Sequence, residues 1–296
     1  MPKGYVYNGN IYRPTVEAGT VVVPVTEGCT HNSCRFCTMF KDVPFRMLKE
    51  DEIEYYMDFS ARVYGNHVDR LFLAGADPFA MSADHLETAV RIARKHFPSV
   101  KTITMYAAVR NVISKSDEEL SRIHDMGISD LYVGIENALE DVLANLNKGN
   151  TIEEARTQMK RFNDAGIVWN ALLMAGAAGK GRGEESALAA AEFLNDTRPG
   201  LISVTTFGVF PGTEIEKDVK DGKFIQADEI ENLKEQRTLI QNLALPDTVY
   251  WAMHSLNSVQ LHGVLGKKKA HMLDQLDAAI RQMESRGFNQ KIRLHV

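Results

Sequence analysis

Short apolar runs alternate with amphipathic stretches along most of this chain. Each of six runs has the length and composition of a buried strand, and a stretch of helical period follows it. The runs fall at residues 21–25, 71–74, 102–106, 131–135, 167–174 and 201–209, and the main helical stretches at 49–64, 84–96, 117–126, 184–195, 228–243 and 269–286, with further helices on either side of residue 148. Six strand-then-helix units in succession predict a parallel sheet. Because the runs are apolar throughout, we expect the sheet to be buried on both faces.

Whole-chain properties narrow the class of protein. With 296 residues, 44% hydrophobic and 25% charged, the chain can bury an ordinary core. The formal net charge of −5 and the lack of a long Lys/Arg block give no support for a nucleic-acid partner. We find no signal-peptide pattern and no apolar run of membrane-spanning length, so we expect a cytoplasmic protein without a membrane partner.

All three cysteines, Cys29, Cys34 and Cys37, lie within nine residues. An odd and local set of this kind does not fit a disulfide framework and indicates soft-metal ligation in a reducing compartment. Three thiolates in one loop can hold three irons of a [4Fe–4S] cluster and leave the fourth iron open to a small molecule. The alternative is a zinc site with His31 as fourth ligand, although structural zinc sites usually draw on two separated ligand pairs.

The cysteine triad follows the first predicted strand, and Phe36 stands just before its last member. This arrangement resembles the radical S-adenosylmethionine (SAM) superfamily, and the resemblance covers residues 21 to 213. The family usually spaces its cysteines C-x3-C-x2-C, whereas this chain has one more residue in the first gap. The resemblance implies a [4Fe–4S] cluster and SAM as cofactors, with Phe36 among the cofactor-binding residues.

A second motif follows the second predicted strand. There the chain has Gly75, Ala76, Asp77 and Pro78, where the family has a Gly-Gly-Glu-Pro-like turn that binds the amino group of SAM. The resemblance therefore implies that the first three of these residues bind the cofactor. Asp77 is one methylene shorter than the usual Glu of the family. The same residue types also favour an ordinary turn between a strand and a helix.

A third motif, VGIENALEDVLANLNKGNT, begins in the fourth predicted strand. It is similar to the G-x-E…L…K-G-x-T stretch of relatives of oxygen-independent coproporphyrinogen oxidase and of tRNA methylthiotransferases. The resemblance places Glu136 where those families have an acid that faces the cofactor. We interpret Lys148 and Gly149 as a helix end, and Thr151 as the N-cap of the next helix.

Further cofactor contacts are implied near the fifth and sixth predicted strands. The family often places adenine against the sixth strand, which implies that Thr206 and Phe207 contact the base. Phe207 belongs to the core in the alternative interpretation, and Asn170 on the fifth strand is open to the same two interpretations. Arg110 is a candidate partner of the SAM carboxylate, and an exposed surface arginine is the alternative.

The motifs share one position relative to the predicted strands. The cysteine triad follows the first strand, the Gly75–Pro78 turn follows the second, and Glu136 lies at the end of the fourth. In parallel α/β barrels and in open α/β sheets, sites are built at this carboxyl end of the strands. We therefore expect the motifs to form one site, a pattern that a surface zinc site would not produce.

The expected fold is α/β, a partial parallel (β/α)6 barrel with a C-terminal helical extension, and an open doubly wound sheet is the alternative. We expect an N-terminal segment (1–20), the barrel (21–245) and a C-terminal cap and helix (246–296). Because a six-unit barrel leaves its side open, the cap would shield the reaction from water. Within the cap, His254 and Asn257 are candidate substrate-binding residues; the alternative is that this segment only packs the sheet edge.

The resemblance implies a radical SAM enzyme. Such an enzyme cleaves SAM reductively at the cluster to a 5′-deoxyadenosyl radical, which abstracts hydrogen from a substrate, expected here to be a small molecule. An electron donor such as flavodoxin or ferredoxin is implied as a partner. The chain has no further cysteine for a second cluster, which disfavours sulfur insertion. The alternative from another class is a non-catalytic barrel that binds zinc or an iron–sulfur cluster.

Overall fold

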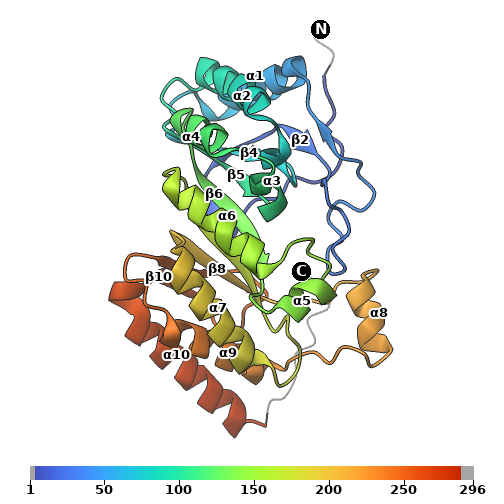
Figure 1. Ribbon diagram of the computed structural model, residues 1–296, viewed down its shortest axis with the longest axis vertical. Coiled ribbons are helices and arrows are strands. Elements are labelled where there is room, and N and C mark those ends of the chain that lie inside the picture. Colours follow the sequence, from blue (N-terminus) through green and yellow to red (C-terminus); the bar gives the residue numbers. More distant parts are fainter. Residues whose placement is uncertain (1–3, 288–296) are drawn as a thin grey trace. The chain divides into compact units, whose positions relative to one another are not determined.

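The structure is a computed structural model and describes residues 4–287. It contains two compact units, and the chain passes from one to the other within two of its strands. The first unit is formed by Met1–Asn32, Met39–Val133 and Gln158–Trp169, and the second by Ser33–Thr38, Gly134–Thr157 and Asn170–Val296. Figure 1 labels the elements of both.

The sheet of the first unit is parallel. Its strands follow the order β1 (Val21–Pro24), β4 (Arg70–Ala74), β5 (Thr102–Ala107) and β6 (Ile128–Glu136), of which β6 ends in the second unit. A separate antiparallel pair joins β2 (Thr26–Glu27) to β3 (Arg46–Met47). Leu71, Phe72 and Leu73 are fully buried, so both faces of β4 are covered, as the uniformly apolar run predicts.

Helices of the first unit follow its strands. They are α1 (Glu50–Tyr64), α2 (Ala83–His96), α3 (Val109–Ile113) and α4 (Asp117–Asp125), with the short 3-10 helices η1 (Thr15–Glu17) and η2 (Pro78–Ala80), while α6 (Ile152–Asp164) runs from the second unit into the first. Helix α2 packs against both α1 and α4. Ser116 and Glu119 form a capping box at the start of α4, which satisfies two backbone N–H groups there.

The second unit combines parallel and antiparallel pairing. Its strands β7 (Val168–Ala175), β8 (Leu201–Thr206) and β9 (Val249–Ala252) pair in parallel, and β10 (Leu261–Val264) pairs antiparallel with β9. Its helices are α5 (Glu140–Asn145), α7 (Gly183–Thr197), α8 (Glu214–Lys220), α9 (Glu229–Asn242) and α10 (Leu265–Ser285). Helix α9 lies between α7 and α10 and packs against both (Figure 1).

Strand β7 buries one face more completely than the other. Ala171, Leu173 and Ala175 are buried, whereas Leu172 and Met174 between them are half-buried. The prediction that this apolar run is buried on both faces was therefore only partly right. Leu173, Met174 and Ala175 line a small cavity together with residues of α7 and α9.

The six predicted strands are all present, and the predicted helices are found close to their expected bounds. Two further strands, β9 and β10, lie in the segment 246–268 that was expected to be a cap, and β9 extends the sheet by pairing with β8. The division of the chain into residues 1–20, 21–245 and 246–296 stays a prediction. Within residues 4–287, no helix has both the length and the apolar character needed to cross a membrane.

Candidate functional site

Within residues 4–287 the three cysteines form no disulfide, and all of them are half-buried. Cys29 belongs to the first unit, and Cys34 and Cys37 belong to the second. Among residues 4–287, no group of three or more His, Cys, Asp or Glu side chains is positioned to hold a metal ion. The donor chemistry nevertheless fits an iron–sulfur cluster, because thiolates are the ligands that such clusters require. The role of the three cysteines as ligands stays a prediction.

The backbone turns sharply on either side of Cys29. Gly28 has φ +65°, and a Cβ there would approach the carbonyl oxygen of Val43 to 2.5 Å, so this position needs glycine. Asn32 is also left-handed, with φ 45°, and its backbone N lies 3.5 Å from the Cys29 Sγ. Its side chain donates to the carbonyl oxygen of Phe40 at 2.8 Å, which holds the turn.

The turn after β4 packs directly on β2. Gly75 has φ +140°, and a Cβ there would overlap the Oγ1 of Thr26 and approach its carbonyl oxygen to 2.7 Å. Thr26 Oγ1 is buried and has no hydrogen-bond partner within the described part of the chain. An unsatisfied buried hydroxyl costs about 1–3 kcal/mol. Ala76 beside this turn is half-buried, so part of it is accessible to solvent.

Asp77 ties this turn to the loop that carries Cys29. Its carboxylate is 1% exposed and accepts hydrogen bonds from the hydroxyl of Thr30, from Arg110 Nη2 at 3.1 Å and from Asn111 Nδ2 at 2.7 Å. Arg110 also lies 4.0 Å from the Cys29 Sγ, and its Nε donates to Thr30 Oγ1 at 3.3 Å. The predicted residues Cys29, Asp77 and Arg110 are therefore brought together within the first unit.

A buried lysine supports the same turn. Lys115 is 5% exposed, and its Nζ donates to the carbonyl oxygen of Phe79 at 2.8 Å and lies 4.6 Å from the centre of the Phe79 ring. Burial lowers the pKa of Lys115 to about 8. Sequence reasoning missed this residue, because a single lysine before a helix gives no sign of burial.

Glu136, the last residue of β6, has an unusual backbone conformation. Its φ is 64°, and its Oε1 accepts a hydrogen bond from Lys148 Nζ at 2.7 Å, with both side chains 13% exposed. A Cβ at Gly134 would overlap the Glu136 carboxylate, so the small residue two positions earlier makes room for it. A left-handed non-glycine residue is costly and is found preferentially at functional sites. Lys148 therefore lies at a helix end and also binds the Glu136 carboxylate.

The helix end and the N-cap predicted next to Lys148 are both present. Lys148 N donates to the carbonyl oxygen of Leu143 at 3.1 Å, and Gly149 follows with φ +81°. Thr151 Oγ1 accepts from Glu154 N at 3.1 Å, and the Glu154 carboxylate accepts from Thr151 N at 2.8 Å. This capping box confirms the interpretation of Thr151 as an N-cap.

A chain of buried hydrogen bonds runs from the residue after Glu136 to α9. Asn137 Nδ2 donates to Ser186 Oγ at 2.8 Å, and Ser186 Oγ donates to Glu235 Oε1 at 2.7 Å. Gly176 N, at the end of β7, donates to Glu235 Oε2 at 2.7 Å. Burial raises the pKa of Glu235 to about 7, although these two donors oppose the shift. Glu235 thereby connects the ends of β6 and β7.

A small cavity adjoins Glu235. The volume accessible to the centre of a water molecule is about 20 Å³, which is room for about one water. Gln236 lines it, is 1% exposed, and has a buried Nε2 without a hydrogen-bond partner among the residues described. The sequence analysis did not identify Glu235 as buried, although an acid on the apolar face of a predicted helix is a usable signal.

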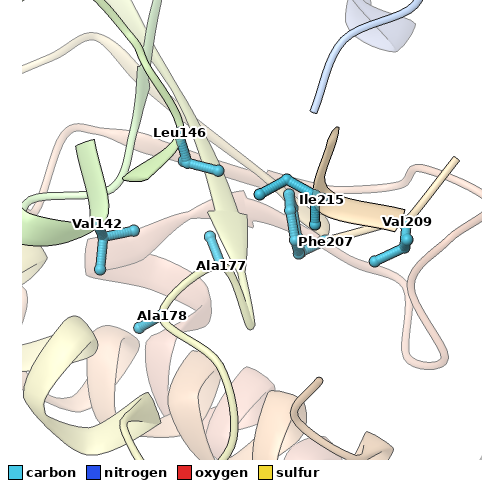
Figure 2. Packing of buried hydrophobic residues seen from close by; sticks show 7 residues of the cluster. All are labelled: Val142, Leu146, Ala177, Ala178, Phe207, Val209 and Ile215. Carbon is cyan, nitrogen blue, oxygen red and sulfur yellow. The ribbon is translucent and has the colours of Figure 1, made fainter. Parts of the chain in front are cut away.

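Phe36 packs into a hydrophobic cluster of the second unit. Its ring centroid lies 6.4 Å from that of Phe207. The buried members of the cluster are Val142, Leu146, Ala177, Ala178, Phe207, Val209 and Ile215 (Figure 2). Phe207 is 7% exposed, which agrees with the alternative that its ring belongs to the core.

The remaining predicted residues lie on or beside β7 and β8. Asn170 on β7 is 4% exposed. Asn257 Oδ1 accepts from Thr206 N at 2.7 Å and from Thr206 Oγ1 at 3.0 Å, and its Nδ2 donates to the carbonyl oxygen of Val204 at 2.8 Å. His254 is half-buried, and its burial lowers its pKa. Roles of these residues in binding stay predictions, and Asn257 has a clear structural role.

A comparison with protein-family models identifies one family. The model of the radical SAM superfamily matches residues 23–194, more than half of the chain. Among curated proteins, none matches this chain.

Several solved structures have a similar fold. The Elp3 protein of the archaeon Methanocaldococcus infernus is 13% identical with a TM-score of 0.56, over 91% of this chain and 64% of that chain. Coproporphyrinogen III oxidase (HemN) of Escherichia coli, a radical SAM enzyme, is 17% identical with a TM-score of 0.56, over 75% of this chain and 50% of that chain. Methylornithine synthase (PylB) is 14% identical with a TM-score of 0.55, over 92% of this chain and 82% of that chain. These likenesses confirm the predicted α/β fold, and the chain spans less than two thirds of the Elp3 and HemN chains.

Proposed function

Because this chain belongs to the radical SAM superfamily, whose enzymes use SAM and a [4Fe–4S] cluster, we propose that it cleaves SAM reductively and uses the 5′-deoxyadenosyl radical to abstract hydrogen from a small molecule. The observation that carries the proposal is the local set of three half-buried cysteines, Cys29, Cys34 and Cys37, within the matched range. We assign Cys29, Cys34 and Cys37 as the ligands of the cluster.

The cluster, when bound, supplies the electron that breaks a C–S bond of SAM, and the protein supplies binding and orientation. We assign the methionine end of SAM to the Gly75–Asp77 turn and to Arg110. Support comes from the guanidinium of Arg110, which lies beside Cys29 and is held there by Asp77. Guanidinium groups bind carboxylates strongly, often through two parallel hydrogen bonds.

We assign Glu136 to the ribose or amino-acid part of SAM. The support is its strained backbone and its ion pair with Lys148, which fixes the carboxylate at the end of a strand. We assign adenine to the backbone at the end of β8, since Thr206 Oγ1 is engaged with Asn257 and the Phe207 ring with the core. Asn170 completes this set of cofactor contacts.

We propose a small-molecule substrate, a low-potential electron donor such as flavodoxin or ferredoxin, and a reducing cytosolic setting. The support for the setting is chemical, because ligation of a cluster requires reduced cysteines, which reducing compartments maintain. His254 remains our candidate for substrate contact. Its Nδ1 accepts from Leu256 N at 3.2 Å, which fixes the orientation of the ring.

Anaerobic reconstitution tests the proposal. The reconstituted protein should hold about four irons per chain, and after reduction it should convert SAM to 5′-deoxyadenosine, measured by liquid chromatography and mass spectrometry. Cys34→Ala should lose both properties, whereas Thr38→Ala, an exposed position in the same loop, should keep both. Undiminished iron content and SAM cleavage in Cys34→Ala would refute the assignment.

A further inference from the structure

Arg35 lies in the loop that carries Cys34 and Cys37, all within the second unit. Its side chain is 23% exposed and forms ion pairs with two acids of α8. The Nε donates to Glu214 at 3.1 Å, and Nη2 donates to Asp218 at 2.5 Å. Asp218 is itself only 15% exposed, so this second pair is shielded from water. The arginine thus joins the loop to a helix about 180 residues further along the chain.

The remaining donors of Arg35 reach the end of α5. Nη1 donates to the carbonyl oxygen of Asn145 at 2.9 Å and to its Oδ1 at 2.6 Å. The backbone repeats both connections, because Arg35 N donates to the carbonyl oxygen of Leu146 at 3.0 Å and Ile215 N donates to the carbonyl oxygen of Arg35 at 3.3 Å. One residue therefore bonds to α5 and to α8 through both its side chain and its backbone.

The next residue anchors the same loop by apolar contacts. Phe36 packs against the hydrophobic cluster of the second unit. Val142 of α5, Leu146 just after α5 and Ile215 of α8 belong to this cluster (Figure 2). The two residues between Cys34 and Cys37 are thus held by a polar and an apolar anchor. The loop has no regular secondary structure of its own, so it depends on contacts of this kind to stay in place.

We propose that Arg35 is a positioning residue for the cluster, which joins the Cys34–Cys37 segment to α5 and α8 and so slows the loss of iron. A guanidinium suits this task because its rigid fork binds several acceptors at once, which a lysine ammonium does not reproduce. The inference rests on the cluster of the proposed function. It adds a residue that acts through its bonds to Glu214, Asp218 and Asn145 and that governs how long two of the thiolates stay in place.

Iron release tests the inference. Reconstituted protein is mixed anaerobically with the ferrous chelator bathophenanthroline disulfonate, and the rate of iron transfer is followed by absorbance. Arg35→Ala should release iron about tenfold faster, a change of about 1.4 kcal/mol in the opening of the loop. The rate of iron release from Arg35→Lys should fall between the rates of the wild type and of Arg35→Ala. The matched control is Arg156→Ala, because Arg156 also pairs with acids of the second unit, among them Glu192 and Asp196 of α7, which lie outside α5 and α8. This variant should leave the rate unchanged.

A second measurement does not need the cluster. Hydrogen–deuterium exchange of the metal-free protein should show faster exchange at residues 33–38 in Arg35→Ala and in Asp218→Asn, which alters the partner instead. Iron release at the wild-type rate in both of these variants would overturn the inference. An equal acceleration in Arg156→Ala would also overturn it, since the effect would then reflect a general loss of stability. The iron content of the wild-type protein reports separately on the proposed function.

Discussion

The buried carboxyl of Glu235 should make the stability of the second unit depend on pH. Burial raises its pKa from 4.5 to about 7, and the donors Ser186 Oγ and Gly176 N only partly oppose this shift. The folded chain therefore keeps the proton at pH values where the unfolded chain has lost it. The contribution of the protonated Glu235 carboxyl to stability is fully present below its pKa in the unfolded chain. This contribution is lost as the pH rises through its pKa in the folded chain.

The magnitude follows from the two pKa values. Each pKa unit corresponds to about 1.4 kcal/mol, so the whole contribution is about 3 kcal/mol between 4.5 and about 7. Because part of it is already lost at pH 5, the change between pH 5 and pH 8 is about 2–3 kcal/mol. This exceeds the error of a denaturation experiment and is a large fraction of the stability of a typical protein.

Glu235→Gln is the perturbation that isolates this contribution. The amide keeps the shape of the side chain, so its oxygen can accept from Gly176 N and its nitrogen can donate to Ser186 Oγ, but it does not titrate. Chemical denaturation of both proteins at pH 5, 6, 7 and 8 should show the variant gaining about 2–3 kcal/mol relative to the wild type as the pH rises.

Glu184→Gln, at an exposed position of α7, controls for the loss of a carboxylate and should show no such trend. A difference between wild type and Glu235→Gln that stays constant within about 0.5 kcal/mol over this pH range would refute the reasoning, because it would mean that the carboxyl titrates alike in both states.

Two further substitutions test the roles of buried polar groups. Asp77→Ala should weaken SAM binding about ten- to a hundredfold, the equivalent of a hydrogen bond to a charged group. The reason is that Arg110 and Thr30 lose the acceptor that holds them. Equilibrium binding to the reconstituted protein measures this affinity, and an unchanged affinity would limit Asp77 to a structural role. Asn257→Ala should lower the free energy of unfolding by about 2–3 kcal/mol, because backbone groups of Val204 and Thr206 lose their partners; a loss below about 0.5 kcal/mol in chemical denaturation would contradict it.

The strands could be predicted from the sequence because a strand that is buried on both faces consists of a continuous apolar run. Leu71, Phe72 and Leu73 form an uninterrupted apolar run, and all three are fully buried. The missed strands β9 and β10 are only four residues long, and in β9 half-buried Trp251 alternates with fully buried Tyr250. Such short alternating segments give a periodicity too weak to distinguish a strand from a loop.

The motifs of the site could be located from the sequence, but their contacts could not. The resemblance implied that Asp77 binds the cofactor, but it did not predict that the Asp77 carboxylate accepts hydrogen bonds from Thr30 and Asn111, which lie 47 and 34 residues away in the sequence. Arg35 gave no signal either, since its partner Asp218 lies 183 residues away. Contacts of this kind depend on how distant elements pack, which no local pattern reports.

The two gaps of the cysteine loop differ in length and in their contacts, which bears on where the loop can accept an insertion. The extra residue of this chain, relative to the usual family spacing, falls between Cys29 and Cys34, where left-handed Asn32 turns the backbone. The second gap holds only Arg35 and Phe36, and both are fastened to α5 and α8. An insertion in the first gap lengthens a turn, whereas an insertion in the second would pull one anchor out of register. Length variants among natural or engineered relatives should therefore accumulate before the second cysteine and be eliminated after it.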